Sequence, residues 1–436
     1  MILCGLAVGL GACETMRTIL GGETEQPLPG ERISVLALEQ SLEPDPRIAD
    51  LEVRLPRPFA NPAWPQTGGY ANHAMQHLAL ADKIKPVWRA DIGAGAASET
   101  RLLASPIVAD GKVFTMDSED RITAFGAADG KRLWRVGLTP AGEDRGELGG
   151  GLAFDDGVLY VTTGFGDVYA LDPASGRFFW RQGVGAPIRG APTASGGRVF
   201  VISSENQLQV LAAKTGEKLW VNAGIEEVAD LVGAGSPAVE GNIVVAPYSS
   251  GELVALRVEN GRQAWSDLLG GTRRITPLGT INDINGSPVI DRGRVFAISY
   301  SGRMVAIDLR TGVRIWDQNI SGANTPWVAG DFVFVLTIEN ELIALSQRDG
   351  RVRWVRQLPR FEDQEDREGR IIWTGPVLAG DRLILVGSHE KAITVSPYTG
   401  EIFGRMDLPD RASLAPVIAD GTLYILTDDA RLVAYR

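Results

Sequence analysis

A glycine followed four residues later by a tryptophan recurs along this chain, and this repeat constrains the fold more than any other feature. The six pairs are Gly130/Trp134, Gly176/Trp180, Gly216/Trp220, Gly261/Trp265, Gly312/Trp316 and Gly350/Trp354. Each glycine follows an Asp, Asn, Ser or Thr, a combination typical of tight turns because glycine tolerates positive φ. An alternating apolar segment, such as residues 304–307, precedes most of these turns. The pattern therefore predicts repeated antiparallel strands.

The spacing of the tryptophans sets the size of the repeat. From Trp88 to Trp354 they lie 38 to 51 residues apart, which is the length of a propeller blade. A seventh repeat has Gly404 at the tryptophan position, and an eighth begins at Pro416 but lacks its last strand, whose form residues 86–89 have. We therefore predict an all-β fold, an eight-bladed β-propeller of four-stranded antiparallel blades over residues 63–436. Pairing of its N- and C-terminal strands would close the ring.

The tryptophans of the repeat are predicted to wedge between neighbouring blades, where they would bury large apolar areas. The set comprises Trp88, Trp134, Trp180, Trp220, Trp265, Trp316 and Trp354. Three further tryptophans, Trp64, Trp327 and Trp373, lie outside the repeat register. For these three we expect packing roles, not ligand stacking.

Composition and charge exclude several classes of function. The chain has 43 Lys and Arg against 54 Asp and Glu, a net charge of −11, which disfavours nucleic-acid binding because that needs clustered cations. Its two cysteines are Cys4 and Cys13, so the repeat region has no disulfide, cysteine-ligated zinc or thiol nucleophile. No apolar run reaches the roughly 20 residues of a membrane-spanning helix. His73 and His77 lack an evident third ligand, so we predict no metal site.

The N-terminus has the character of an export signal. Residues 2–12 are apolar or small and end in Leu-Gly-Ala before Cys13, which resembles a bacterial lipobox. We predict a lipoprotein signal peptide over residues 1–13 and lipidation at Cys13, which would anchor the protein to a membrane without spanning it. Met1 runs directly into apolar residues without the cations of such a signal, so we expect the true start codon to lie upstream. A buried apolar strand is the alternative.

Residues 14–62 separate this signal from the repeats. They are rich in proline and charge, which breaks long helices and strands, and we predict a flexible tether. One apolar island at residues 33–38 could dock on the ring or on a partner, and the sequence leaves that choice open.

The repeat is clearest at residues 306–316, which read Ala-x-Asp-x-x-Thr-Gly-x-x-x-Trp. This pattern resembles the repeats of quinoprotein dehydrogenases and of the BamB family of outer-membrane protein assembly lipoproteins. A quinoprotein would imply pyrroloquinoline quinone (PQQ) held by calcium on the ring axis. The repeat region lacks cysteines and inserted segments to enclose such a cofactor, and Asp172 and Asp308 are interpreted as turn caps. The BamB resemblance instead implies a lipoprotein at the periplasmic face of the outer membrane, with no catalysis and no cofactor.

The BamB resemblance also implies where a partner binds. In that family, neighbouring inter-blade loops contact the β-barrel protein BamA. The matching positions are Ala229, Asp230, Leu231 and Val232 in one loop and Asp283 and Asn285 in the next. Both loops are long, since Trp220 and Pro237 lie 17 positions apart and Trp265 and Pro288 lie 23 apart, whereas blade stacking needs only a short link.

The residue types in these loops suit an interface. Leu231 and Val232 would be exposed apolar anchors, and Arg273, Arg274 and Asp283 would steer a partner. The alternative, that the two apolar side chains tuck beneath the blade, is equally supported. Another long connection, residues 360–370, is mostly charged and is predicted to be a solvated excursion.

Together these features predict a non-enzymatic scaffold of the β-barrel assembly machinery. The expected partner is a BamA-like protein, bound through its periplasmic domains, and nascent outer-membrane proteins are a second one, bound by strand addition at blade edges. The lipid anchor is the expected membrane contact. A PQQ-dependent dehydrogenase or another ligand-binding periplasmic propeller is the alternative.

Overall fold

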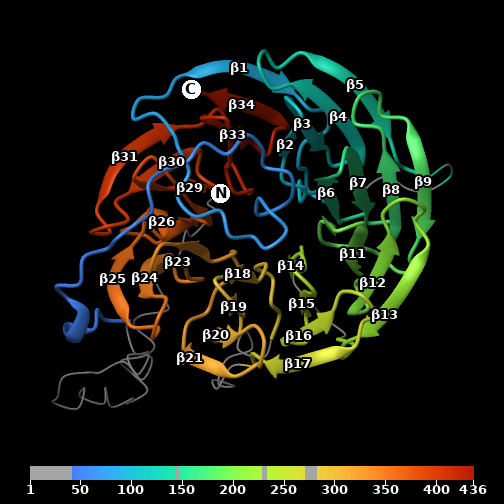
Figure 1. The fold of residues 1–436 in the computed structure, drawn as a ribbon. Coiled ribbons are helices and arrows are strands. Elements are labelled where there is room, and N and C mark those ends of the chain that lie inside the picture. Colours follow the sequence, from blue (N-terminus) through green and yellow to red (C-terminus); the bar gives the residue numbers. More distant parts are fainter. Residues whose placement is uncertain (1–41, 141, 143–146, 228–232, 271–281) are drawn as a thin grey trace, which may run out of the picture. The chain divides into compact units, whose positions relative to one another are not determined.

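The computed structural model describes residues 42–140, 142, 147–227, 233–270 and 282–436, and nearly all regular structure among them is β-strand. Eight four-stranded antiparallel sheets follow one another around a ring in these residues (Figure 1). The predicted all-β, eight-bladed propeller is confirmed. The described ranges contain one short helical turn, η2 (Pro46–Ile48), and no helix in them is long and apolar enough to cross a membrane.

In each blade the strands run from the axis outwards in sheet order. Blade 1 comprises β2 (Ile107–Ala109), β3 (Lys112–Met116), β4 (Arg121–Gly126) and β5 (Arg132–Gly137). Blade 2 comprises β6 (Gly150–Asp155), β7 (Val158–Thr163), β8 (Asp167–Leu171) and β9 (Phe178–Gly183). Blade 3 comprises β10 (Thr193–Ser195), β11 (Arg198–Ile202), β12 (Gln207–Ala212) and β13 (Lys218–Ala223). Blade 4 comprises β14 (Ala238–Glu240), β15 (Ile243–Pro247), β16 (Glu252–Arg257) and β17 (Gln263–Leu268).

The second half of the ring repeats this arrangement. Blade 5 comprises β18 (Val289–Asp291), β19 (Arg294–Ile298), β20 (Met304–Asp308) and β21 (Arg314–Gln318). Blade 6 comprises β22 (Trp327–Ala329), β23 (Phe332–Leu336), β24 (Glu341–Ser346) and β25 (Val352–Gln357), and the exposed hairpin β26 (Phe361–Asp363) and β27 (Glu368–Arg370) follows it. Blade 7 comprises β28 (Trp373–Ala379), β29 (Arg382–Gly387), β30 (Lys391–Val395) and β31 (Ile402–Asp407). Blade 8 comprises β32 (Val417–Ala419), β33 (Thr422–Leu426), β34 (Arg431–Tyr435) and β1 (Pro86–Asp91).

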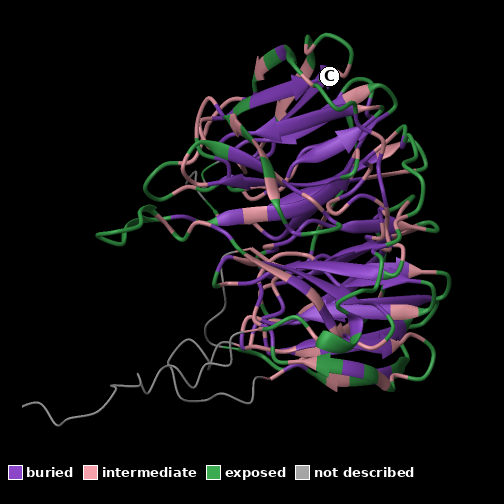
Figure 2. Cartoon of the chain, turned by 90° about the vertical axis from the view of Figure 1, so that its left-hand side faces the viewer, coloured by how far each residue is buried: buried purple, intermediate pink, exposed green. Residues whose placement is uncertain are grey.

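Blade 8 closes the ring with strands from both ends of the propeller. β1 pairs with β34, so that Pro86 lies opposite Tyr435 and Trp88 opposite Ala434. The predicted closure is therefore confirmed. Buried residues fill the strands, and exposed residues gather in the turns and along the outer strands (Figure 2).

Each repeated tryptophan meets the turn glycine of the next blade, not that of its own. Trp180 donates its Nε1–H to Ala213 O at 3.0 Å, and a Cβ on Gly216 would lie 2.7 Å from its indole ring. The same bond, to the carbonyl three residues before a turn glycine, is made by all seven tryptophans. Blade 7 carries Gly404 instead because blade 8 has no such turn, its two outermost strands being separate ends of the ring.

Residues 61–80, which we call the plug segment, wind around one mouth of the ring and contact the inner part of every blade. In Figure 1 this is the blue chain over the middle of the ring. The contacts follow ring order: Asn61 (blade 8), Trp64 (blade 1), Pro65 (blade 2), Gln66 (blade 3), Ala71 (blade 4), Asn72 (blade 5), Gln76 (blade 6) and Leu78 (blade 7).

The prediction of a flexible tether over residues 14–62 is wrong for its C-terminal part. Asp45 N donates to Val352 O at 2.8 Å, and Arg353 Nε donates to Leu51 O at 2.7 Å. Prolines prevent regular structure here, but the backbone still finds hydrogen-bond partners on blade 6 and in the plug segment. The rest of the predicted tether, with its apolar island, and the signal peptide with Cys13 lie outside the described residues.

Candidate functional site

Strand direction divides the ring into two faces. Because successive strands are antiparallel, the turn after each inner strand and the turn before each outer strand lie at one end of the blade. The inter-blade links lie at the other end. Two turns of the first kind, at Gly330 and Gly380, donate their backbone N–H to Gln76 and Leu78 of the plug segment. We call this end the plug face and the opposite end the loop face, which carries the predicted partner loops.

The described ends of these two loops come together on the loop face. Ser236 N donates to Ser287 Oγ at 2.9 Å, and a Cβ on Gly233 would lie 3.6 Å from Asn285 Oδ1. Ser287 N in turn donates to Thr325 Oγ1 at 3.0 Å, just before blade 6. The links that precede blades 4, 5 and 6 thus form one continuous surface.

The structure describes two of the predicted partner residues. Asp283 is 3% exposed, and the next residue, Ile284, packs in a core cluster with Trp265 and Leu269. Asp283 therefore supports its loop from inside and does not steer a partner from the surface. Asn285 is half-buried at the junction of the two loops. Six further positions lie outside the described residues, and their role stays a prediction: Ala229, Asp230, Leu231, Val232, Arg273 and Arg274.

A small hollow lies beside this junction, between blades 3 and 4. It is lined by residues that include Arg189, Ser203, Asn206, Pro247 and Asp283, and its volume is about 20 Å³. That is about the room needed by a single water molecule. This part of the loop face therefore has no space for an organic cofactor, and its chemistry is that of a protein-binding surface.

A buried carboxyl group lies on the loop face of blade 1. Asp120 is 4% exposed, and burial raises its pKa to about 7, with Asp117 and Glu147 contributing. Asp117 instead accepts three backbone N–H bonds and one from Arg121 Nε, so it caps its turn. Sequence reasoning missed Asp120 because an aspartate in a turn carries no signal of its burial.

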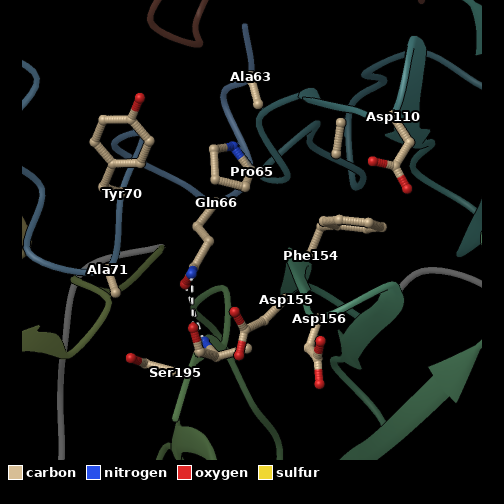
Figure 3. Close-up of a pocket in the computed structure, with 12 residues that line it drawn as sticks. Ala63, Pro65, Gln66, Tyr70, Ala71, Asp110, Phe154, Asp155, Asp156 and Ser195 are labelled. Carbon is tan, nitrogen blue, oxygen red and sulfur yellow. Dashed lines mark hydrogen bonds between the residues drawn. The ribbon is translucent and has the colours of Figure 1, made fainter. Parts of the chain in front are cut away.

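A larger hollow lies on the plug face, between the plug segment and blades 1 to 3 (Figure 3). Its volume is about 340 Å³, and its polar lining includes Gln66, Tyr70, Asp110, Asp155, Asp156 and Ser195. Gln66 reaches across to blade 3, where it bonds both the N–H and the carbonyl of Ala194. Burial, followed by Asp156, raises the pKa of Asp155. These carboxylates belong to separate turns, and the described residues contain no cluster of three or more metal-ligating side chains.

The two histidines of the plug segment hold it to the ring. His73 Nδ1 lies 2.7 Å from Pro288 O, and burial lowers the pKa of His73 to about 4. The neutral ring therefore donates from Nδ1. His77 Nδ1 lies 2.8 Å from Pro56 O, and its Nε2 accepts from Asp381 N at 3.0 Å. The two side chains bond separate carbonyl groups and do not converge on one ion.

Apolar side chains of the plug segment fill the mouth of the ring. Trp64 bridges to blade 1 through its backbone yet stacks on Trp327 of blade 6, with ring centroids 6.2 Å apart. Met75 and Leu78 are buried beside this pair. A quinone held by calcium would need clustered oxygen ligands here. The described residues do not fit such a group.

Comparisons with known proteins identify two kinds of relative. Residues 77–143 and 118–356 match the family model described as outer membrane protein assembly factor BamB. The BamB of Yersinia pestis is 25% identical over 355 residues, covering 80% of this chain and 88% of that protein. The BamB of Salmonella typhimurium is 27% identical over 357 residues, covering 80% of this chain and 88% of that protein.

Solved structures show the same fold. BamB from Moraxella catarrhalis superposes with a TM-score of 0.69 and 18% identity, covering 81% of this chain and 100% of that one. A quinohemoprotein alcohol dehydrogenase from Comamonas testosteroni superposes with a TM-score of 0.64 and 14% identity, covering 86% and 80%. Both likenesses concern the propeller alone.

Proposed function

Because the chain belongs to the family of outer membrane protein assembly factor BamB, we propose that it is a non-enzymatic scaffold for the assembly of outer-membrane β-barrel proteins. The family match over residues 77–143 and 118–356 carries this proposal. In this role the protein is held at the periplasmic face of the outer membrane by a lipid on Cys13. It binds the periplasmic domains of a BamA-like barrel protein and assists the folding and insertion of client barrels.

The loop face at blades 4 and 5 is the partner site in this proposal. Two long loops meet there through Ser236, Ser287 and Asn285, and a rigid ring holds them in one orientation. The plug segment occupies the opposite face, so the ring can be joined to its N-terminal region without obstructing these loops.

A quinone-dependent dehydrogenase is the second candidate, and likeness of fold favours it. The apolar packing of Trp64 and Trp327 in the ring mouth opposes it. Mixing the protein with calcium and PQQ, desalting it and recording the quinone absorbance separates the two candidates. The scaffold proposal expects no retained absorbance.

The sharpest test of the partner site replaces Leu231 by Asp and measures co-purification with the barrel protein from solubilised outer membranes. A charged side chain in an apolar hot spot costs 2 kcal/mol or more, which weakens binding about thirtyfold. The matched control is Val313→Asp, because Val313 is 64% exposed on a plug-face turn of blade 5. Undiminished association of Leu231→Asp, or equal loss with Val313→Asp, contradicts the assignment.

A further inference from the structure

Every outer strand of the ring carries a β-bulge at the same place. In all eight pairs of third and outer strands the register shifts at the residue just before the tryptophan position. On six blades the bulged residue is a large apolar side chain that is at least 39% exposed: Val87, Leu133, Phe179, Leu219, Ile315 and Phe403. Ala264 and Arg353 take this place on the other two blades. The bulges thus present apolar side chains around the circumference.

On four consecutive blades an arginine follows two positions after the bulged apolar residue. The pairs on blades 7, 8, 1 and 2 are Phe403/Arg405, Val87/Arg89, Leu133/Arg135 and Phe179/Arg181. Blades 3 to 6 have Val221, Ser266, Asp317 and Val355 at the arginine position. Their outer strands β31, β1, β5 and β9 are neighbours around the ring (Figure 1). We call this half of the circumference the basic sector.

Several cations of the basic sector are exposed and available. Arg132 precedes Leu133, and Arg177 lies 5.9 Å from the centroid of the Phe179 ring. Arg181 pairs with Asp167 at 2.7 Å. Arg89, Arg132, Arg177 and Arg405 are exposed and form no ion pair with a described carboxylate.

The opposite side of the ring differs in charge. On blades 4 and 5 the outer strands carry Asp267 and Asp317, and Arg314 pairs with Asp267 at 2.6 Å. The bulged Ile315 therefore stands in a locally neutralised setting. Apolar exposure extends around most of the ring, whereas its combination with unpaired arginine is concentrated in the basic sector.

The bulges also decide how this surface can bind. A bulge bends its strand and interrupts the regular row of backbone groups, which disfavours the addition of another strand. Recognition along this edge therefore falls to side chains, and the strand addition expected from the sequence is disfavoured.

We propose that the basic sector is a membrane-docking surface that binds anionic lipid headgroups and inserts its bulged apolar side chains into the interface. Apolar side chains flanked by arginine are the composition of surfaces that lie on membranes. The whole chain has a net charge of −11, so an anionic bilayer repels most of the protein and attracts this sector. The inference rests on the outer-membrane location proposed above.

The path of the chain supports a lipid surface as the occupant. Residues 43–51 bond to β25 of blade 6, through Asp45 to Val352 and Leu51 to Arg353. Blade 6 adjoins blade 7, the first blade of the basic sector, so the chain leads away from the ring beside this sector. Outer strands run along the ring axis, so docking by this edge leaves both the plug face and the loop face clear of the bilayer.

The test uses the full chain with Cys13→Ser, which removes the lipid, and measures co-sedimentation with vesicles at physiological salt. We expect binding to phosphatidylcholine vesicles that contain phosphatidylglycerol and none to phosphatidylcholine alone. An arginine near an anionic surface contributes about 1 kcal/mol, or about fivefold in affinity. Adding Arg89→Gln and Arg132→Gln together should therefore weaken binding about 25-fold. Leu133→Ser should weaken it at unchanged charge.

Matched controls lie on blade 5, across the ring. Ile315→Ser alters an equivalent bulge, and Arg310→Gln removes an exposed cation there, and both should bind as the parent does. Equal losses in these controls, or no binding of the Cys13→Ser chain to anionic vesicles, overturns the proposal. So does binding to an unfolded acidic polypeptide in place of vesicles. The vesicle measurement contains no barrel protein, so its failure is distinct from a failure of the partner assignment.

Discussion

The two faces of the ring are built from the same repeats but serve opposite purposes. On the plug face one segment contacts all eight blades, and Trp64, Met75 and Leu78 are almost fully buried. On the loop face the connections differ in length, and two of them meet only through short contacts such as Ser236 to Ser287. A face covered by its own chain contributes stability, whereas a face of unequal loops can carry recognition.

Each face also buries one titratable group, and the two respond to pH in opposite directions. His73 on the plug face has its pKa lowered to about 4 by burial. Asp120 on the loop face has its pKa raised to about 7, chiefly by burial. Both groups are neutral where their ordinary pKa values would make them charged, so both environments exclude charge.

The largest difference between the faces should appear when Trp64 is replaced by Ala. Removing a buried tryptophan costs about 3–5 kcal/mol of unfolding free energy, because its stack on Trp327 is lost and a cavity remains. Urea unfolding measures this change. Val313→Ala, at a 64% exposed position, is the control and should change stability by less than about 0.5 kcal/mol. A similar small change for Trp64→Ala would show that the plug segment adds nothing to the ring.

The pH dependence of stability sharpens the comparison. The folded pKa of His73, about 4, lies below its ordinary 6.5, so its contribution is present above pH 6.5 and lost as the pH falls towards 4. The folded pKa of Asp120, about 7, lies above its ordinary 3.8, so its contribution is present at acid pH and lost as the pH rises towards 7. Each contribution is on the order of 3 kcal/mol.

The two opposing slopes nearly cancel in the parent protein between pH 4 and 6.5, where both windows overlap. His73→Gln should therefore leave a stability that falls with rising pH, and Asp120→Asn one that rises. Urea unfolding at closely spaced pH values measures both slopes. Parallel slopes in the two variants would contradict the opposite assignments.

The smallest stability effect is expected on the loop face. Asn285→Ala should change the unfolding free energy by less than about 0.5 kcal/mol, since surface loop substitutions seldom do more, and should instead weaken association with the barrel protein. Calorimetry and co-purification measure the two effects separately. A large loss of stability with unchanged association would assign Asn285 to the fold.

Sequence reasoning predicted the ring because its signals are local. Turn residues before Gly312 and strand alternation in residues 304–307 act within a few positions, so their repetition gives the blade and its count. It also placed the repeated tryptophans between blades, but the partner of Trp180 proved to be Gly216 of the next blade. At the site, the burial of Asp283 and Asp120 could not be predicted, because both depend on how loops stack on neighbouring blades.

The sequence by itself determined that this chain forms an eight-membered ring closed by its two ends, since period-two alternation and turn chemistry specify each blade independently of the others. Only the tertiary structure decided the course of the plug segment, in which Asn61 bonds Ile418, 357 positions away. That segment has no repeat of its own. Its backbone groups are satisfied by the rims of blades that exist as a surface once the ring has closed.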